Sequence, residues 1–452
     1  MNELRELRTA AREIFDDALA AVDVRRAVLD AVKLDGATLR VGDTRFGLRG
    51  ETPKVYSVAL GKAAAAMASA LDERMGDAFA GGVISAPPSD LKLSGRWRVY
   101  AGGHPLPNAE SVEAARAAFE LLREADDAEA LVIFLVSGGG SAMMELPRDE
   151  SLTLEELREA NRVLVTCGAP IDEVNAVRRA LSAVKGGGLA SHAPRAAQAT
   201  LVVSDVGAGR AYDVASGPTF VAPPDAPGIS DIRARYGLAS KLPASVLRAL
   251  EEPGTHSPSQ PSPEAQRAFH VLLDNESACE AAVRAARLRG FAVEYARDLV
   301  EQPVDEGAQA LASRLAELCA REHLSGRPVC LISGGEFSCP VRGGGTGGRN
   351  SETALRVAFE FDEKVLAGGG TGLVPKHSVA LCVGTDSIDG NSPAAGALAD
   401  ETTVGRAQAL GLDARKFLDE SDAYTLFEQL GDSVNTGPTG TNVRDVRILL
   451  AV

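Results

Sequence analysis

No apolar run in this sequence approaches the roughly 18 residues that a membrane-spanning helix needs. Residues 1–8 are charged and lack the apolar core of a secretory signal peptide. Basic residues are also outnumbered, because 47 Lys and Arg stand against 62 Asp and Glu and give a net charge of −15. A nucleic-acid partner would require a basic surface. These absences predict a cytoplasmic protein with no membrane partner and no nucleic-acid partner.

Paired cysteines are missing as well. The 6 cysteines are scattered, none of them forms a Cys-x-x-Cys motif, and the 6 histidines are equally dispersed. A disulfide framework or a zinc site would need such side chains at recognisable spacings. We therefore expect reduced cysteines, several of them buried in strands, and no histidine-based metal centre.

Three common signatures of nucleotide or acyl chemistry are absent or misplaced. There is no Gly-x-x-x-x-Gly-Lys-[Ser/Thr] loop and no Gly-x-Ser-x-Gly elbow. Residues 343–348 match Gly-x-Gly-x-x-Gly, but they stand late in the chain. A dinucleotide fingerprint follows the first strand of a βαβ unit, with an acidic residue about 20 positions on. The aspartate after the next clear strand, Asp386, comes about twice as far on, which disfavours a nicotinamide site.

The most informative stretch that is present is an apolar run followed by a glycine-rich turn. Residues 131–136, Leu-Val-Ile-Phe-Leu-Val, predict a buried strand of a parallel sheet. Ligands of such sheets bind beyond the carboxyl ends of the strands, where glycine amides can approach an anion. We predict a phosphate-binding turn, and the alternative is a connection that binds nothing. The turn consists of Ser137, Gly138, Gly139, Gly140 and Ser141.

Strands and helices alternate along the whole chain, which predicts an α/β fold with two domains. Residues 252–263 are rich in proline and serine and are typical of a linker. We place a larger Rossmann-like domain with a mostly parallel sheet at 1–252. A smaller α/β domain is placed at 265–452.

Charged residues follow several of the predicted strands. Lys62 comes after the strand 55–60 and could reach a phosphate, the alternative being an ordinary exposed lysine in a turn. Asp205 follows another strand, and Asp386 and Asp389 follow a third. Carboxylates at strand ends are suited to hold Mg²⁺ or to accept a hydroxyl proton. Together these groups favour phosphoryl transfer.

Two further polar segments were considered as binding sites. The loop 342–350 precedes a helix, and its amides together with Arg349 make it a candidate anion site. Arg178, Ser182 and Lys185 have the spacing of one helix face next to a glycine run. Such a stripe is usually a solvated face, and that alternative stays open here.

The ordered motifs resemble the bacterial and archaeal glycerate 2-kinases over nearly the whole chain. The segments similar to their N-terminal domain are 103–108 (Gly-His-Pro-Leu-Pro-Asn), 136–142 (Val-Ser-Gly-Gly-Gly-Ser-Ala), 181–188 and 216–219 (Ser-Gly-Pro-Thr). The segments similar to their C-terminal MOFRL domain are 333–336 (Ser-Gly-Gly-Glu), 347–350 (Gly-Gly-Arg-Asn), 384–390 (Gly-Thr-Asp-Ser-Ile-Asp-Gly) and 436–442.

This resemblance implies transfer of the ATP γ-phosphate to the 2-hydroxyl of D-glycerate with Mg²⁺, in a cleft between the two domains. The implied catalytic residues are Lys62, Arg349 and Asp386. The implied substrate- and nucleotide-binding residues are the turn Ser137–Ser141, Lys185, Gly347, Gly348, Asn350, Thr436 and Asn442. The implied metal ligands are Asp205 and Asp389. The expected partner is a small hydroxy acid such as D-glycerate. A homodimer with a second copy of the chain is a possible assembly.

One loop departs from the family pattern. Asp205 is kept, but the residues after Val206 are Gly-Ala-Gly-Arg-Ala, without the further aspartates usual in the family. Three alternatives to a glycerate 2-kinase therefore remain at this point. They are an NAD(P)H-dependent hydroxypyruvate reductase, a kinase for another short hydroxy acid, and a non-catalytic sensor that binds a sugar acid.

Overall fold

The structure is a computed structural model that describes residues 2–48, 54–220, 228–251, 262, 264–366 and 375–452. The predicted linker at 252–263 lies outside the described residues except for position 262. The chain divides into two compact units, Val24–Leu272 and a second one made of Met1–Asp23 with Leu273–Val452. Each unit is described here by itself.

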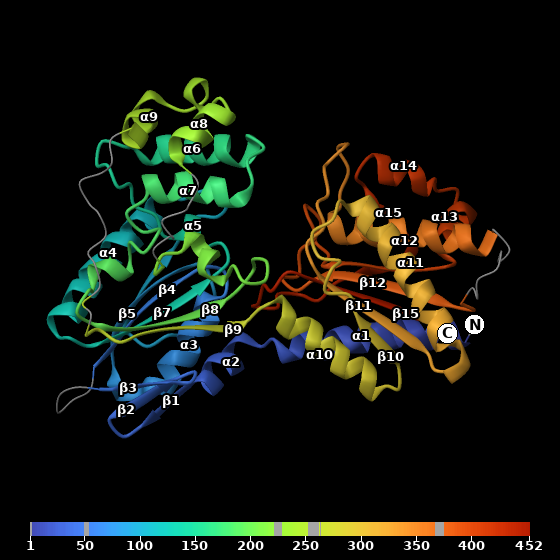
Figure 1. Cartoon of the computed structure of the whole chain (residues 1–452), viewed down its shortest axis with the longest axis horizontal. Helices are drawn as coiled ribbons and strands as arrows, with labels where there is room; N and C mark the ends of the chain where they lie inside the picture. Colours follow the sequence, from blue (N-terminus) through green and yellow to red (C-terminus); the bar gives the residue numbers. More distant parts are fainter. Residues whose placement is uncertain (1, 49–53, 221–227, 252–261, 263, 367–374) are drawn as a thin grey trace. The chain divides into compact units, whose positions relative to one another are not determined.

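A sheet with a parallel core forms the centre of the unit Val24–Leu272 (Figure 1). Strands β6, β5, β4, β7 and β8 run parallel, and β9 extends the sheet next to β8. Every residue of β7 is buried, so the predicted central strand is confirmed. In spatial order the strands are β6 (Trp97–Ala101), β5 (Phe79–Ala86), β4 (Val55–Leu60), β7 (Leu131–Ser137), β8 (Ala197–Val203) and β9 (Arg267–Leu273).

The helices around this sheet begin where the sequence supplies a cap and an apolar stripe. In α4, Asn108 accepts a hydrogen bond from the backbone N–H of Ser111, which satisfies an amide that the helix itself cannot use. Leu122, on the apolar face of α4, belongs with Phe134 and Val58 to one buried apolar cluster. The helices of this part are α2 (Val24–Ala31), α3 (Ala64–Met75), α4 (Ala109–Asp127) and the short α5 (Gly140–Met143).

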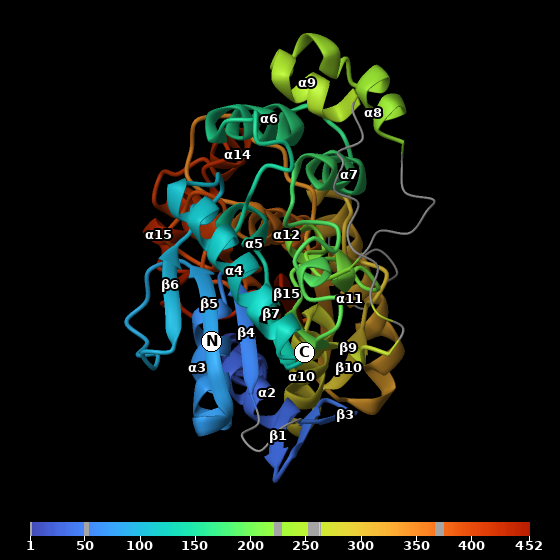
Figure 2. The same cartoon turned by 90° about the vertical axis from the view of Figure 1, so that its left-hand side faces the viewer.

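A separate group of helices in the same unit packs around its own apolar cluster (Figure 2). Leu157, Leu164 and Val246 are among its buried members. These helices are α6 (Leu154–Thr166), α7 (Ile171–Leu181), α8 (Ile229–Arg235) and α9 (Ala244–Glu251). A small antiparallel sheet precedes β4 and consists of β1 (Val32–Asp35), β2 (Thr38–Val41) and β3 (Thr44–Gly47).

The second unit contains a mixed sheet. β15 lies at its centre, fully buried, and pairs antiparallel with both β11 and β12. The strands in spatial order are β10 (Ala292–Tyr295), β11 (Val329–Gly335), β15 (Asp445–Ala451), β12 (Ser378–Gly384), β13 (Gly396–Asp400) and β14 (Ser433–Val434). Its helices are α1 (Asn2–Ala21), α10 (Asn275–Leu288), α11 (Val304–Glu322), α12 (Arg349–Leu366), α13 (Thr403–Ala409), α14 (Ala414–Asp419) and α15 (Ala423–Leu430).

The compact units differ from the predicted domain bounds of 1–252 and 265–452 at both ends of the first domain. The N-terminal helix α1 lies beside α10 and the strands β12 and β15, with Ile14 and Phe15 buried (Figure 1). At the other end, β9 belongs to the sheet of the unit Val24–Leu272. The reason is the same at both ends, because an apolar stripe is buried by whichever partner the topology brings to it.

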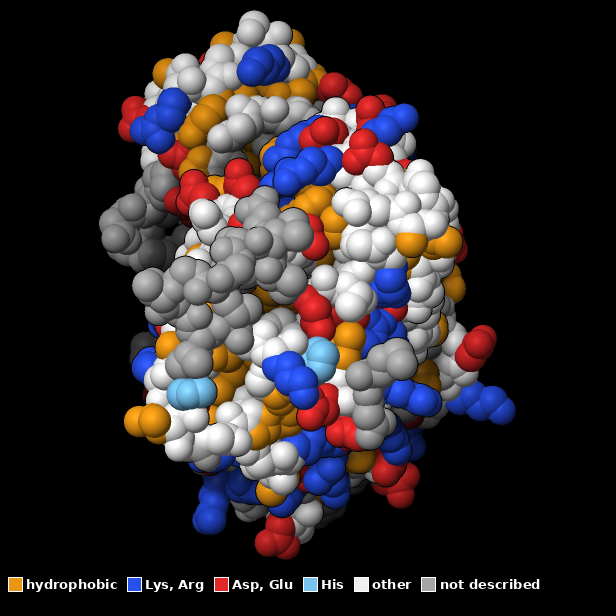
Figure 3. Space-filling model, turned by 90° about the vertical axis from the view of Figure 1, so that its right-hand side faces the viewer, with side chains coloured by type: hydrophobic (Ala, Val, Ile, Leu, Met, Phe, Trp, Pro, Cys, Tyr) orange, Lys and Arg blue, Asp and Glu red, His pale blue; other side chains and the backbone are white. Residues whose placement is uncertain are grey.

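The described helices include none that is long and apolar enough to cross a membrane. On the face shown in Figure 3, Lys and Arg side chains are interspersed with Asp and Glu side chains. This mixed surface agrees with the acidic overall composition, in which carboxylates exceed basic groups.

Candidate functional site

Three sequence-predicted groups meet at one edge of the sheet in the unit Val24–Leu272. β4, β7 and β8 run parallel, with Leu60 opposite Val136 and Ser137 opposite Val203. Their carboxyl ends therefore lie side by side. This places Lys62, the Ser137–Ser141 turn and Asp205 at the same edge.

Glycines allow these groups to approach one another closely. A Cβ at Gly138 would overlap the carboxylate of Asp205. A Cβ at Gly139, whose φ is +80°, would lie 3.2 Å from Cγ of Lys62 and 3.1 Å from the His104 ring. The backbone of Lys62 also donates to the Gly138 carbonyl at 2.8 Å. The turn is thus a surface of backbone atoms, against which Asp205 lies at Gly138 and Lys62 lies at Gly139.

His104, which the sequence showed only as part of the motif 103–108, also lies at this edge. Partial burial lowers its pKa, and the positive charge of Lys62 lowers it further. The imidazole is therefore held in its neutral form, while the side chain of Lys62 is exposed. A neutral ring thus stands beside the exposed ammonium of Lys62.

The expected helix face with Arg178, Ser182 and Lys185 is not formed, because α7 ends at Leu181. Lys185 is 1% exposed, and its ammonium is paired with the buried carboxylate of Glu145. Ser182 Oγ donates to the same carboxylate at 2.5 Å. The structure therefore gives Lys185 a buried protein partner where the resemblance implied a ligand. Its ion pair ties the loop after α7 to the segment after α5.

Replacement of Lys185 by methionine is expected to destabilise the protein by about 3–5 kcal/mol, because Glu145 would keep a buried charge without its partner. Urea unfolding measures this loss. The double variant Lys185→Met with Glu145→Leu is the control, since it removes both charges of the pair and is expected to recover most of the stability. A Lys185→Met protein as stable as the wild type would show that the pair has no structural role.

Another set of predicted residues gathers at an edge of the sheet in the second unit. β11 and β12 end there and β15 begins there, so that Asp445 lies opposite both Gly335 and Gly384. Asp445 is fully buried, and it accepts a hydrogen bond from the Asn350 side chain at 3.0 Å. This aspartate organises the site, although the sequence did not single it out.

Arg349 is held by two carboxylates. Its Nε donates to Asp445 at 2.6 Å, and its Nη2 donates to Asp445 at 3.0 Å and to Glu336 at 2.7 Å. Burial opposes the charge, but the two carboxylates outweigh it and raise the pKa of Arg349. Among the described residues Nη1 has no hydrogen-bond partner. A fixed guanidinium thus keeps one nitrogen available for an anionic ligand.

The start of α12, predicted as an anion site, already holds an anion of the protein itself. The Asp389 carboxylate accepts from the backbone N–H of Asn350 and of Ser351, each at 2.8 Å, and from Ser351 Oγ at 2.7 Å. Asp389 is 1% exposed, and burial raises its pKa. This aspartate therefore caps a helix, and the metal binding that the resemblance implied for it stays a prediction.

The amides of Gly347 and Gly348 also have partners within the protein. They donate to Asn391 Oδ1 at 2.8 Å and to Ser351 Oγ at 3.1 Å. The glycines here serve close packing, because a Cβ at Gly348 would meet the Asp389 backbone at 2.5 Å. These two amides are therefore occupied within the protein, and ligand binding at Gly347 and Gly348 stays a prediction.

Asp386 lies near Arg349's neighbour Asn350. A Cβ at Gly384 would be 3.2 Å from the Asp386 carboxylate and 3.5 Å from the Asn350 amide nitrogen. The Asn350 oxygen is buried without a hydrogen-bond partner among the described residues.

The loop that carries Thr436 and Asn442 is tied to this edge through Thr439, which donates to the Thr385 carbonyl at 2.7 Å. Within the part of the chain that the structure describes, the side chains of Thr436 and Asn442 make only local bonds, to the Gly437 carbonyl and from the Arg444 amide.

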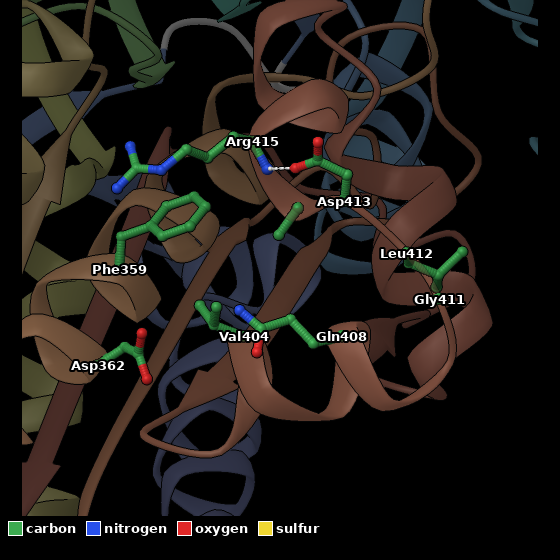
Figure 4. A pocket seen from close by; sticks show the side chains of 9 residues that line it. Phe359, Asp362, Val404, Gln408, Gly411, Leu412, Asp413 and Arg415 are labelled. Carbon is green, nitrogen blue, oxygen red and sulfur yellow. Dashed lines mark hydrogen bonds between the residues drawn. The ribbon is translucent and has the colours of Figure 1, made fainter. Parts of the chain in front are cut away.

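A pocket of about 490 Å³ lies elsewhere in the second unit, between α12, α13 and the start of α14 (Figure 4). Phe359, Val404 and Gln408 line it, and the Arg415 guanidinium stacks over the Phe359 ring at 4.6 Å. None of the sequence-predicted site residues lines this pocket. Its geometry therefore does not bear on the candidate site.

Two charged residues at this edge that were not predicted, Asp445 and Glu336, have a signal in the sequence. Asp445 and Arg447 are charged residues two positions apart at the start of an otherwise apolar strand. Residues at this spacing share one face of a strand, and a charge buried in a sheet has to be paired. Glu336 stands out in the sequence only as part of the motif 333–336, although it directly follows a buried strand. It is the second carboxylate that accepts a hydrogen bond from Arg349.

Comparison with known protein families gives two matches. Residues 10–251 match the family described as a domain of unknown function, DUF4147. Residues 329–445 match the MOFRL family. The two matches lie in the same order along the chain as the two groups of motifs in the sequence.

Several known proteins are similar over nearly the whole chain. The glycerate 2-kinase of Pyrococcus horikoshii is 32% identical over 448 residues, which are 98% of this chain and 97% of that protein. A crystal structure of a glycerate kinase from Thermotoga maritima is 31% identical, covers 99% of this chain and 100% of its own, and has a TM-score of 0.82. A relative from Agrobacterium vitis, 34% identical over 98% of this chain and 94% of its own, carries the provisional name hydroxypyruvate reductase.

Proposed function

The chain belongs to the glycerate 2-kinase family, whose members join a DUF4147 domain to a MOFRL domain, and we propose that it phosphorylates the 2-hydroxyl of D-glycerate with ATP. The observation that carries this proposal is the pair of sheet edges, each with one positioned cation and with carboxylates beside it. Lys62 and Asp205 contact neighbouring glycines of one turn. At the other edge Arg349 is held by Asp445, and the side chains of Asp386 and Asn350 both approach Gly384. Phosphoryl transfer needs these groups, because it depends on positioning and on neutralising the charge of the migrating group.

We assign the roles as follows. Lys62 and Nη1 of Arg349 bind the oxygens of the transferred phosphoryl group, and Asp386 accepts the proton of the 2-hydroxyl. The Ser137–Ser141 turn binds the substrate on its backbone surface. The position of the reaction centre in a cleft between the domains stays a prediction, as do the homodimer and the cytoplasmic location.

These residues fit a magnesium ion that is held by a single carboxylate of the protein together with water and the nucleotide phosphates. The described residues contain no group of three or more His, Cys, Asp or Glu side chains that could hold a metal ion. Mg²⁺ in kinases commonly uses one or two carboxylates and takes its other ligands from water and the nucleotide phosphates. Asp205, which lies against Gly138, is the carboxylate that we propose to hold it. When bound, Mg²⁺ neutralises phosphate charge.

The proposal predicts that the purified protein converts D-glycerate and Mg-ATP to 2-phosphoglycerate and ADP. Phosphorus NMR against authentic 2- and 3-phosphoglycerate identifies the hydroxyl that carries the phosphate. The 3-phosphate as product would contradict the assigned regiochemistry. Oxidation of NADH with hydroxypyruvate, without any consumption of ATP, would favour the reductase instead.

A further inference from the structure

A chain of three polar side chains runs from the glycine-rich turn into the interior of the unit Val24–Leu272. Ser141 Oγ lies 2.7 Å from Ser216 Oγ, and Ser216 Oγ donates to Asn175 Oδ1 at 3.0 Å. Ser216 is 2% exposed and Asn175 is 5% exposed, whereas Ser141 is only half-buried. One end of the chain is thus fixed in the interior, and the other end can meet a ligand.

The backbone at Ser216 is held in a strained conformation. Ala215, Ser216 and Gly217 have φ values of +53°, +61° and +69°, a left-handed run that two of these residues adopt at a cost. The Gly186 and Gly187 amides fix it by donating to the Ser216 and Gly217 carbonyls at 3.2 and 2.8 Å. Strain maintained in this way is typical of sites where a side chain must be placed accurately.

The turn and the strained segment touch because Gly140 has no side chain. A Cβ at Gly140 would lie 2.8 Å from the Ala215 Cβ. The close approach of these two backbones places Ser141 within hydrogen-bond distance of Ser216. In the same turn Gly138 contacts Asp205 and Gly139 contacts Lys62, so Ser141 belongs to the edge that carries the charged groups.

The direction of the hydrogen bonds determines what Ser141 offers to a ligand. The Asn175 oxygen can only accept, so the single hydroxyl proton of Ser216 is used for Asn175. The bond between the two serines must then use the proton of Ser141. No other partner of Ser141 Oγ is found among the described residues, and its oxygen keeps lone pairs but no proton to give. Ser141 therefore presents an acceptor, which suits a hydroxyl group and disfavours phosphate or carboxylate oxygens.

We propose that Ser141 Oγ accepts a hydrogen bond from the hydroxyl of the substrate that is not phosphorylated, the 3-hydroxyl of glycerate, with Ser216 and Asn175 as positioning residues. This inference rests on the proposed kinase function. The 2-hydroxyl, which reacts, is excluded as the partner of Ser141 because its proton must leave during the reaction. The hydrogen-bonded series Ser141–Ser216–Asn175 ends in an amide, which cannot take up that proton. The contact makes Ser141 the residue that distinguishes a hydroxymethyl from a methyl group next to the reacting carbon.

The experiment compares D-glycerate with D-lactate, which carries a methyl group in place of the hydroxymethyl group. In Ser141→Ala we expect kcat/KM for D-glycerate to fall about tenfold, the loss of one well-formed hydrogen bond. The affinity for D-lactate, measured as its inhibition constant against D-glycerate, is expected to stay unchanged. A change in discrimination between the two compounds is a result that general loss of structure would not give.

Variants of the positioning residue and a matched serine complete the test. Asn175→Asp keeps an acceptor for Ser216 and is expected to retain the discrimination, whereas Asn175→Leu is expected to lose it. Ser191→Ala is the control, because this serine donates only to the nearby Gly188 carbonyl at 2.8 Å and is expected to behave as wild type.

Two results would overturn the inference. One is an equal loss with D-glycerate and D-lactate in Ser141→Ala, and the other is an unchanged discrimination. Failure of the proposed function is recognised separately, as a wild-type protein that phosphorylates no hydroxy acid. Calorimetric titration of wild type and Ser141→Ala with D-glycerate and D-lactate, in the absence of ATP, then decides the inference by binding alone. Equal affinities of the wild type for the two compounds in that titration would also overturn it.

Discussion

Replacement of Lys62 by alanine is expected to lower kcat by about 100- to 1,000-fold, the loss typical when one group that stabilises transition-state charge is removed. The lysine follows β4 and lies against Gly139, and its neighbour His104 is held neutral. Lys62 is the permanent cation that the turn contacts at Gly139. The charge of the migrating phosphoryl group would therefore go unpaired there.

The fold is expected to survive this change, because the Lys62 side chain is exposed and contributes little to the core. Steady-state kinetics and thermal unfolding of the same preparation separate the two effects. Lys92→Ala, which removes an exposed lysine of the same unit, is the matched control and is expected to have wild-type kinetics. Near-normal turnover in Lys62→Ala would remove this residue from the mechanism.

The fold was predictable wherever a local pattern determines the structure. The unbroken apolar run at 131–136 can be accommodated only with both faces covered, and β7 is indeed the buried strand beside β4 and β8. The partner of α1 was not predictable in this way. An apolar stripe such as that of α1 predicts a helix with one buried face, but it does not say which distant segment covers that face, here α10 of the second unit.

The site was predictable to the extent that its residues follow strands. Lys62, Asp205 and Asp386 were identified because parallel or aligned strands deliver their next residues to one edge. Asp445 escaped this logic because it begins a strand, and it reaches the edge only since β15 runs antiparallel to β11 and β12. The direction of a strand depends on contacts distant in sequence, and it is not visible in a motif.

Asp389 and Lys185 have partners within the protein that the sequence did not reveal, for a related reason. Both are charged residues beside glycines, a pattern that ligand sites share with buried structural pairs. The sequence alone cannot distinguish a ligand site from a buried structural pair, because the two differ in whether a group of the protein itself binds the charged side chain. For Asp389 that partner is the start of α12, and for Lys185 it is Glu145.

Arg349→Lys is expected to lower kcat/KM by about 100-fold or more while the charge at this position is kept. The structure gives the reason, since Nε and Nη2 are both used to fix the guanidinium on Asp445 and Glu336 and only Nη1 remains for a ligand. A lysine has a single nitrogen, which can satisfy the buried carboxylate or reach the substrate but cannot hold both positions. Kinetics with saturating ATP and varied D-glycerate measure the effect.

Arg349→Ala is the less informative variant, because it would leave the fully buried Asp445 without its main partner and destabilise the protein by about 3–5 kcal/mol. The matched control is Arg342→Lys in the same loop. Arg342 pairs with Glu352 at 2.8 Å, and Arg356 holds the same carboxylate, also at 2.8 Å, so this exchange leaves the pairing satisfied. Equal kinetics of Arg349→Lys and Arg342→Lys would assign Arg349 to the structure of the edge alone. A selective loss in Arg349→Lys, at unchanged thermal stability, would assign its third nitrogen to the substrate.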